Sequence, residues 1–283
     1  MDQLSYYTSF KSLKDAIQSQ RKDGERIGFV PTMGALHEGH ISLMEEAVKD
    51  ATVLVVSIFV NPTQFNNPID LEKYPRTLDE DVLLIKNRFP NALIISPDFE
   101  EVYGEDIHFP GIDLNGLDQI MEGEFRPGHF QGVCHVVYNL FQLIQPDAAY
   151  FGEKDFQQVA IIKYMVEQLH LPVHVKVCPT KRNEQGLALS SRNLRLSDQQ
   201  KEDALVIYRS LHWMQSEIHH LSIQALKEKV VQDFASSSLT LEYLVFVDPH
   251  NLAVIETYSG QSVTCCIAAY CGEVRLIDNL SLC

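Results

Sequence analysis

Residues 27–60 of the chain read IGFVPTMGALHEGHISLMEEAVKDATVLVVSIFV, and this stretch decides the fold. The apolar run at residues 27–30 predicts a buried strand, and a second apolar run at residues 53–60 predicts the next one. Between them, apolar side chains recur at the spacing of one helix face: Ile41, Leu43, Met44, Ala47 and Val48. Strand, turn, helix and strand together predict a βαβ unit with two parallel strands.

Two histidines, His37 and His40, lie near the start of the predicted helix. The N-terminus of a helix offers unpaired N–H groups and a partial positive charge, so it is suited to bind phosphate. Gly34 and Gly39 would let the backbone approach a ligand closely. The stretch is not a P-loop, because no Gly-Lys-Ser/Thr sequence ends it, and it is not a GxGxxG motif.

The spacing His-x-x-His leaves three interpretations open. It resembles the signature of the nucleotidyltransferase superfamily, in which two imidazoles contact the phosphates of ATP. It is also compatible with two surface histidines that cap a helix. A zinc site is disfavoured, because HEGH is not the helical H-E-x-x-H pattern and no Cys/His cluster completes it.

The composition is that of a globular protein with one large domain or two ordinary ones: 283 residues, 45% of them hydrophobic and 22% charged. The net charge of −15 is a poor match for nucleic acid, so we expect no nucleic-acid partner. If the ligand is an anion such as ATP, basic residues must gather locally, together with a metal ion.

The sequence also indicates where the protein works. No stretch approaches the ~20 apolar residues that span a membrane, and the first residues, MDQLSYYTSFKSLKD, lack the apolar core of a secretory signal. The six cysteines show no CxxC spacing, which is typical of reduced thiols in a chain of this length. We therefore expect a cytoplasmic protein with no membrane partner.

The remaining elements extend the βαβ unit. We predict helices at residues 9–23 and 133–145, further strands at 92–96, 147–151 and 173–178, and an irregular segment at 97–120. From Ser197 the pattern changes to helices at 198–219 and 222–236, followed by alternating segments at 240–247 and 263–271. The predicted class is α/β: a Rossmann-like parallel-sheet domain, residues 1–182, and a smaller α+β domain, residues 183–283.

Two amides, Asn61 and Gln64, follow the second predicted strand, which Pro62 ends. Ligands of open α/β sheets bind at the carboxyl ends of the strands. These amides would therefore suit a hydroxylated substrate or a carboxylate. The other interpretation is turn chemistry, since Asn-Pro commonly begins a turn.

Charged side chains recur at other predicted loops and helix starts. Arg126 is a candidate fork for a carboxylate or a phosphate. Lys154 follows a predicted strand and offers a flexible point charge for phosphate, with Gln158 one helical turn later. The acids at residues 79–81 lie near the start of a predicted helix and complement its dipole, and a magnesium contact is the less favoured interpretation.

Residues 180–193 form a polar loop with three basic residues and two serines. Such a loop could close over a triphosphate, or it could be a linker between domains. It offers few apolar anchors apart from Leu187, Ala188 and Leu189. A segment with few buried contacts opens at low cost, so we expect a mobile lid that ATP orders.

Seven motifs in this order resemble the pantothenate synthetases, the pantoate–β-alanine ligase family. They are PTMGALHEGH, FVNPTQF, YPRT, RPGHFQGV, FGEKDFQQ, GLALSSRN and RLIDN, and they extend from Val30 to Asn279. The chain departs from the family pattern at Leu189, where Met is usual, and at Asn183 and Gln185, where acids are common. Leucine conserves the apolar bulk of methionine, so we expect activity to be retained.

The resemblance implies an ATP-dependent ligase for the formation of pantothenate, a precursor of coenzyme A. The carboxylate of (R)-pantoate would attack the α-phosphate of ATP-Mg to give pantoyl adenylate and pyrophosphate. The amine of β-alanine would then attack the acyl carbon and release AMP. The implied partners are these small molecules and a second copy of the chain in a homodimer, and the implied cofactors are ATP and Mg2+.

The resemblance also assigns residues, although it identifies no metal ligands. The catalytic residues would be His40, His37 and Lys154. The residues around ATP would be Met33, Gly34, Ala35, Leu36, His37, Glu38, Gly39, His40, Gly152, Glu153, Lys154, Asp155, Lys181, Leu189, Ser190, Ser191 and Arg192. Pantoate would contact Gln64, Gln158, Asn61 and Arg126, and β-alanine would contact Gln64.

Two other function classes stay open at this point. A nucleotidylyltransferase would stop at an adenylylated product and would share the histidine pair, but it does not explain Gln64 and Gln158 as a pocket for a small hydroxy acid. A non-catalytic ATP-binding sensor would not need both histidines together with Lys154.

Overall fold

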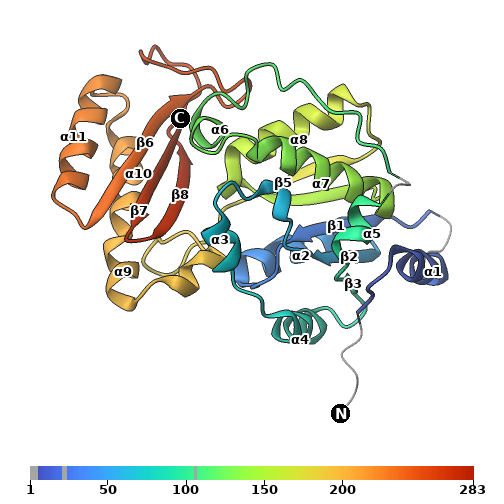
Figure 1. Cartoon of the computed structure of the whole chain (residues 1–283). Helices are drawn as coiled ribbons and strands as arrows, with labels where there is room; N and C mark the ends of the chain where they lie inside the picture. Colours follow the sequence, from blue (N-terminus) through green and yellow to red (C-terminus); the bar gives the residue numbers. More distant parts are fainter. Residues whose placement is uncertain (1–5, 21–23, 105–106) are drawn as a thin grey trace.

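A five-stranded parallel sheet organises the N-terminal part of the computed structural model, which describes residues 6–20, 24–104 and 107–283 (Figure 1). Its strand order is β3-β2-β1-β4-β5. The strands are β1 (Ile27–Thr32), β2 (Val53–Ile58), β3 (Leu93–Ile95), β4 (Ala148–Gly152) and β5 (His174–Cys178). The order changes direction between β1 and β4, so the carboxyl ends of these two strands mark the point where such folds bind ligands.

Successive residues of each strand point to opposite faces of the sheet, and the apolar residues on each face form a separate buried cluster. Helices therefore cover both faces. One face packs against α1 (Phe10–Gln20), α7 (His129–Ile144) and α8 (Phe156–Gln168). The other packs against α2 (Glu38–Asp50) and α4 (Leu78–Arg88). Short helices lie in the connections: η1 (Pro62–Gln64), α3 (Pro68–Glu72), α5 (Phe99–Tyr103), α6 (Met121–Phe125), η2 (Glu153–Asp155) and η3 (Ser191–Arg195).

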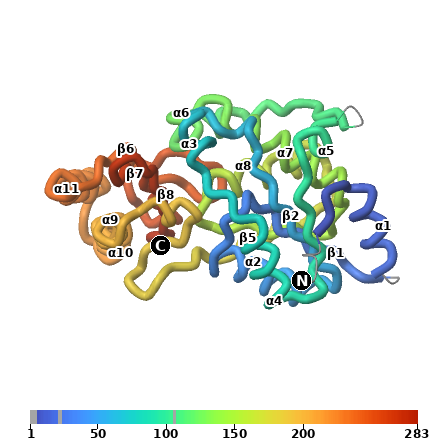
Figure 2. The backbone as a smooth tube through the Cα atoms, turned by 60° about the horizontal axis from the view of Figure 1, so that its bottom comes forward, coloured from blue at the N-terminus to red at the C-terminus, as the bar shows by residue number. Residues whose placement is uncertain are grey.

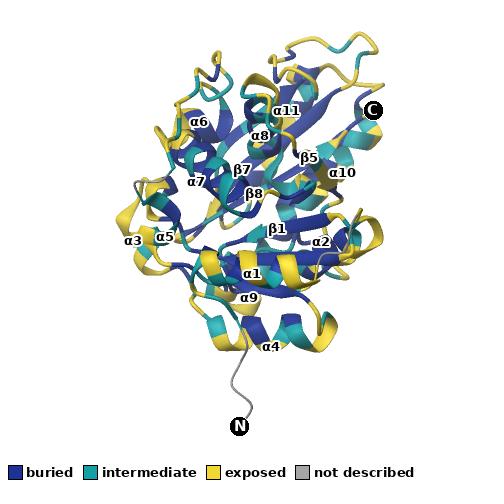
Figure 3. Ribbon diagram, turned by 90° about the vertical axis from the view of Figure 1, so that its right-hand side faces the viewer, coloured by how far each residue is buried: buried dark blue, intermediate teal, exposed yellow. Residues whose placement is uncertain are grey.

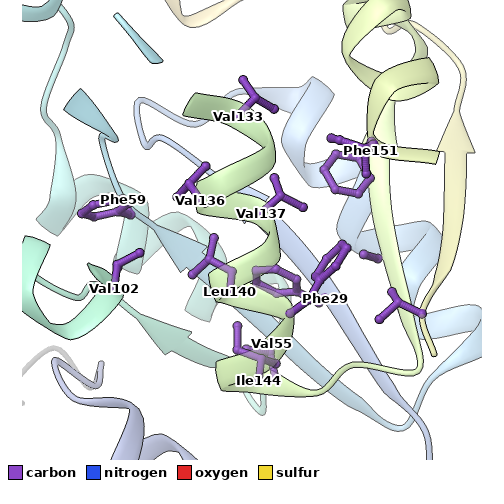
Figure 4. Packing of buried hydrophobic residues seen from close by; sticks show 14 of the residues in the cluster. Phe29, Val55, Phe59, Val102, Val133, Val136, Val137, Leu140, Ile144 and Phe151 are labelled. Carbon is purple, nitrogen blue, oxygen red and sulfur yellow. The ribbon is translucent and has the colours of Figure 1, made fainter. Parts of the chain in front are cut away.

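Helix α7 is the apolar centre of the first layer (Figure 4). Val137 lies on the side of Phe29 and Phe151, Val136 and Leu140 lie on the side of Phe59 and Val102, and all of these side chains are buried. Near the start of α7, a Cβ added to Gly132 would lie 2.5 Å from the carbonyl oxygen of Thr63. Gly132 therefore lets the helix contact the η1 turn directly, and this contact places Gln64 next to the core.

An antiparallel sheet with strand order β6-β7-β8 forms the C-terminal part, at the opposite end of the molecule from α1 (Figure 2). Its elements are α9 (Asp198–Asp203), α10 (Leu205–Glu217), α11 (Ile223–Ala235), β6 (Leu239–Val247), β7 (Thr264–Cys271) and β8 (Val274–Ser281). One face of the sheet packs against α10 and α11, and the other packs against Met121 and Phe156 of the first part. The strands of both sheets are largely buried (Figure 3), except the edge strand β5, which exposes three of its five residues.

The predicted fold class is confirmed, whereas several element boundaries differ. Helix α7 begins at His129, four positions earlier than predicted, and α5 lies in the segment predicted to be irregular. The helix predicted at 9–23 is observed over Phe10–Gln20, and residues 21–23 lie outside the described part of the chain. The helix predicted at 198–219 is divided into α9 and α10.

Strand β8 was not among the predicted strands, and the reason is physical. Asp278 and Asn279 are buried in it, with 5% and 6% of their surface exposed, so the expected alternation of apolar and polar residues is interrupted. Both polar side chains are paired: Asp278 accepts from Arg182, and Asn279 donates to two backbone carbonyls. A strand whose buried polar groups are paired in this way cannot be predicted from the alternation of apolar and polar residues.

The loop at residues 180–193 is better anchored than the sequence indicated. Leu187 is buried in the core of the C-terminal part, and a Cβ on Gly186 would overlap the ring of Tyr208 at 2.1 Å. Ser191 is also buried, and its Oγ donates to the carbonyl of Ala35 at 2.9 Å. The premise of the mobile lid, a loop with few buried contacts, is therefore wrong.

Two further findings concern the helices and the cysteines. Within the described residues, no helix is long and apolar enough to cross a membrane. All six cysteines are in the described part of the chain, and each has a free thiol.

Candidate active site

A cavity of ≈ 250 Å³ opens at the carboxyl ends of β1 and β4, and the second sheet contributes to its wall. It brings together most of the predicted site residues, although they come from distant parts of the sequence. Those that line it are Met33, His37, Gly39, His40, Asn61, Gln64, Arg126, Gly152, Lys154, Asp155, Gln158, Lys181, Leu189, Ser190, Ser191 and Arg192.

Five residues predicted to lie around ATP are not on the cavity wall: Gly34, Ala35, Leu36, Glu38 and Glu153. The first three form the turn beneath the histidines. Glu38 is exposed and pairs with Arg88 at 3.0 Å on the outer surface. The side chain of Glu153 is also exposed, and its carbonyl accepts from Asn279.

The turn at residues 34–36 is held by the carboxylate of Asp81, near the start of α4. Its two oxygens accept from the backbone N–H groups of Ala35 at 2.8 Å and Leu36 at 2.7 Å. Gly34 has φ +79, and a Cβ there would lie 3.0 Å from the same carboxylate. Of the acids at residues 79–81, Asp81 therefore stabilises this turn, and its oxygens are occupied by backbone donors.

His37 and His40 cap the helix that follows this turn. The Nδ1 of His37 accepts from the N–H of Gly39 at 3.1 Å, and the Nδ1 of His40 accepts from the N–H of His37 at 3.3 Å. A ring nitrogen that accepts carries no proton, so hydrogen bonding assigns the proton of each neutral ring to Nε2. Gly39 is required beside them, because a Cβ there would lie 2.7 Å from Cε1 of His37.

Both rings are neutral at pH 7. Burial lowers the pKa of His37 to about 4, and the nearby Lys154 ammonium acts in the same direction. Burial, followed by the charges of His37 and Lys154, lowers the pKa of His40 to about 3. The capping interpretation and the phosphate interpretation are therefore compatible, since Nδ1 caps the helix and Nε2–H remains available as a donor.

The amides at the end of β2 have a fixed orientation. Asn61 is buried, and its Oδ1 accepts from the hydroxyl of Tyr103 at 2.8 Å. Its Nδ2 donates to the Oε1 of Gln64 at 3.1 Å, so the Nε2 of Gln64 is directed away from Asn61 and lies 3.0 Å from the sulfur of Met33. The turn interpretation is therefore also valid, because Asn61 caps η1, yet Gln64, which donates one amide proton to the sulfur of Met33, keeps the other for a ligand.

Gln158 differs from its neighbour Gln157, although both line the cavity. Gln157 is buried, and its Nε2 donates to the carbonyls of Leu117 at 2.7 Å and Ile120 at 2.8 Å. Within the described residues, the side chain of Gln158 has no hydrogen bond to another group of the chain. Gln158 is consequently the amide that is free to pair with a ligand.

Three of the four arginine and lysine side chains expected to meet anions have an acidic partner, the exception among the described residues being Lys181. Lys154 lies 3.4 Å from Asp155, Arg126 lies 3.3 Å from Glu122, and Arg192 lies 2.7 Å from Asp70. Asp70 also pairs with Arg195 at 2.8 Å. These pairs keep the cations ordered at the cavity within a chain of net charge −15.

Several residues at the cavity were not identified from the sequence. Burial alone would raise the pKa of Glu122, but bonds from Arg275 at 2.7 and 2.8 Å hold its pKa at about 2. His129 is buried, and its Nδ1 lies 2.8 Å from the carbonyl of Gln64. Others that line the cavity include Tyr74, Tyr243, Ile277, Asp278, Asn279 and the apolar floor of Val133, Val136, Val137 and Leu140. His129 lies within the RPGHFQGV motif, which was the available signal.

Comparisons with known proteins find relatives that match nearly the whole chain. The family model described as pantoate-beta-alanine ligase matches residues 5–281. Relatives named pantothenate synthetase include one from Christiangramia forsetii, 46% identical over 95% of this chain and 96% of that protein, and one from Bacteroides thetaiotaomicron, 46% identical over 96% of each. The solved pantothenate synthetase from Thermus thermophilus has a TM-score of 0.89 and 38% identity, covering 98% of this chain and 99% of that one. The ligase from Francisella tularensis, solved with Beta-gamma ATP and Beta-alanine, has a TM-score of 0.80 and 35% identity, covering 98% of each.

The lowered pKa values predict how stability depends on pH. When unfolded, His37 and His40 bind protons near pH 6.5, whereas the folded rings stay neutral down to about 4 and about 3. Their contribution is therefore fully present above pH 6.5 and is lost as pH falls, with a slope of up to ~1.4 kcal/mol per pH unit for each ring. Urea unfolding between pH 7 and pH 5 measures this slope.

The double variant His37→Asn, His40→Asn should have a shallower slope, because asparagine can still cap a helix but does not titrate. His220→Asn, at an exposed position after α10, is the matched control and should keep the wild-type slope. An unchanged slope in the double variant would show that the two rings are not held neutral by the fold.

Proposed function

The chain belongs to the pantoate-beta-alanine ligase family, and we propose that the cavity at the ends of β1 and β4 carries out the family's reaction. The activity is ATP-dependent ligation of pantoate to β-alanine. One observation supports this cavity as the site above all others. Two neutral imidazoles, a lysine and an unpaired amide converge on it at the switch in strand order.

In the first step, the carboxylate of pantoate attacks the α-phosphate of ATP and forms pantoyl adenylate. The Nε2–H groups of His37 and His40 donate to the phosphate oxygens, and the ammonium of Lys154 stabilises charge on the α-phosphate and the departing pyrophosphate. Preorganised donors of this kind need no reorganisation when the charge develops. Ser190, Ser191 and Arg192 contact the triphosphate.

Asp70 holds the guanidinium of Arg192 at 2.7 Å. To contact the triphosphate, Arg192 must therefore leave Asp70 or bind both groups together. The turn at residues 34–36 and the segment at residues 152–155 surround the nucleotide, with Leu189 and Lys181 at the cavity wall. Glu38 and Glu153 have exposed side chains, so we propose that these two contribute through their backbone.

Pantoate is oriented by amides and packed against apolar side chains. The Nε2 of Gln64 and the side chain of Gln158 pair with its carboxylate and hydroxyl groups, and Asn61 keeps Gln64 in position. The apolar floor formed by α7 suits the carbon of pantoate that carries two methyl groups. Arg126 completes this end of the cavity, where its guanidinium lies 3.4 Å from the carbonyl of Gln64.

In the second step, the amine of β-alanine attacks the acyl carbon of the adenylate, and AMP departs. Gln64 would also contact β-alanine. The reaction needs no covalent enzyme intermediate, which agrees with a cavity built from donors and cations rather than from a nucleophile and its base. Enclosure between the two sheets protects the adenylate from water.

Magnesium is part of this proposal. Within the described residues, no group of three or more His, Cys, Asp or Glu side chains is arranged to hold a metal ion. This donor set fits a metal bound through one carboxylate and the phosphates of ATP, which is the usual mode for Mg2+. Asp155 would hold it, because its ion pair with Lys154 is long, at 3.4 Å, whereas the other acids at the cavity, Asp278 and Glu122, pair closely with arginines. When bound, the ion would neutralise phosphate charge.

The family resemblance also leads us to propose a homodimer and a cytoplasmic location. Strand β5 is an edge of the parallel sheet and exposes His174, Lys176 and Val177. An uncovered edge of this kind is a surface on which a second copy can pair. The free thiols of all six cysteines support a reducing compartment.

We place the domain boundary near residue 182, between the two sheets.

Product release separates the ligase from its alternatives. With ATP and pantoate alone, the purified protein should release pyrophosphate in one turnover and retain the adenylate, and AMP should appear only when β-alanine is added. His40→Ala should form adenylate ~10²–10³-fold more slowly, the typical cost of one preorganised stabilising group. His220→Ala, at an exposed position after α10, is the control. A wild-type rate in His40→Ala, or AMP release that does not depend on β-alanine, would contradict the proposal.

Gln158→Ala should weaken pantoate binding by the net value of one hydrogen bond, ~0.5–1.5 kcal/mol, and leave ATP binding nearly unchanged. Titration calorimetry with each ligand separates the two effects. Gln168→Ala, at the exposed end of the same helix, is the matched control. Equal losses for ATP and pantoate would mean that Gln158 only shapes the cavity.

A further inference from the structure

The RLIDN motif at residues 275–279 lies in β8, and no step of the proposed reaction uses it. Its last three residues line the cavity, although β8 belongs to the antiparallel sheet. The same strand contacts η2, the turn that carries Lys154 at the end of β4. The motif is therefore the place where the second sheet meets a catalytic segment of the first.

Asn279 makes this connection with one side-chain amide. Its Nδ2 donates to the carbonyl of Glu153 at 3.0 Å and to the carbonyl of Lys154 at 2.9 Å. An amide nitrogen has two protons, so both are used on two consecutive peptide groups. Only 6% of the Asn279 surface is exposed, and water therefore has little access to replace these bonds.

Asn279 is itself held in place. Its backbone N–H donates to the Oδ1 of Asp278 at 2.9 Å. The guanidinium of Arg182 donates to the same carboxylate at 2.9 Å, and this carboxylate is buried. The end of β8 is thus fixed on one side by an ion pair and presents the amide to η2 on the other.

Lys154 depends on the position of its backbone. Its ammonium has one ion-pair partner within the described residues, Asp155, at the long distance of 3.4 Å. The side chain is mostly buried, with 18% of its surface exposed, so it cannot adapt freely if the turn moves. A shift of η2 would carry the ammonium away from the phosphates.

We propose that Asn279 is a positioning residue for Lys154: its amide fixes the η2 turn so that the ammonium meets the α-phosphate and the departing pyrophosphate. This inference rests on the proposed role of Lys154. It also gives the second sheet a part in the first chemical step, through one side chain and two carbonyls.

Asn279→Ala and Asn279→Asp test the two donors. Alanine removes both, and aspartate replaces them with a carboxylate that cannot donate to a carbonyl. Because a misplacement of ~1 Å can cost ~100-fold in rate, we expect pyrophosphate release in a single turnover to slow by ~10–100-fold in both. The KM for pantoate should stay near the wild-type value. Gln215→Ala is the matched control, since Gln215 donates to the carbonyl of Ser281 on the exposed side of β8.

A double-mutant cycle with Lys154→Ala decides whether the effect passes through Lys154. If it does, Asn279→Ala should cost little more in the Lys154→Ala background, because the group that it positions is absent. Circular dichroism and thermal unfolding confirm that each variant is folded. If the alanine variant does not fold, Asn279→Ser, which retains one donor on a shorter side chain, takes its place in the cycle.

The outcomes are distinct. A wild-type rate in folded Asn279→Ala would overturn the positioning role and leave the proposed function intact. The same would follow if Asn279→Ala slowed pyrophosphate release by the same factor with and without Lys154. A wild-type rate in Lys154→Ala would overturn the role of Lys154 in the proposed function, and the positioning role with it. A slowed Asn279→Ala whose loss disappears without Lys154 supports the inference.

Discussion

The site depends on one buried carboxylate. Asp81 accepts from two consecutive backbone N–H groups, those of Ala35 and Leu36, and so fixes the turn between β1 and α2. A neutral amide in its place could accept with only one oxygen and would turn an NH2 group toward a backbone donor. Because the turn is fixed, α2 begins at a defined point. The two histidines that cap this helix then face the cavity at the switch in strand order.

The same arrangement explains how an acidic chain can bind an anion. The imidazoles contribute N–H donors without charge, since burial keeps both rings neutral. Three cations at the cavity, Arg126, Lys154 and Arg192, are each ordered by a neighbouring acid rather than left free in solution. The second sheet closes the site through β8, where Arg275 holds Glu122, Asp278 holds Arg182 and Asn279 holds the η2 turn.

The sequence was sufficient for the fold class, through its apolar patterns, and for many of the polar residues at the cavity, through its motifs and the family resemblance. The βαβ unit follows from apolar spacing, and the loops that follow β1, β2 and β4 supply the histidines, the amides and Lys154. Such local patterns do not show which residues pair when they are far apart in the sequence. Asp81 was interpreted through the helix dipole, β8 was missed because its polar residues are buried, and the 180–193 loop was expected to be mobile although Leu187 anchors it.

The fixed turn at residues 34–36 presents the neutral imidazoles of His37 and His40, each with its proton on Nε2. Long-range 1H–15N NMR of protein labelled with [15N]histidine tests this arrangement directly, with His37→Asn and His40→Asn used to assign the signals. At pH 7 and without ligand, both rings should show an unprotonated Nδ1 and a protonated Nε2. Two protonated nitrogens in either ring, or a proton on Nδ1 alone, would contradict the account.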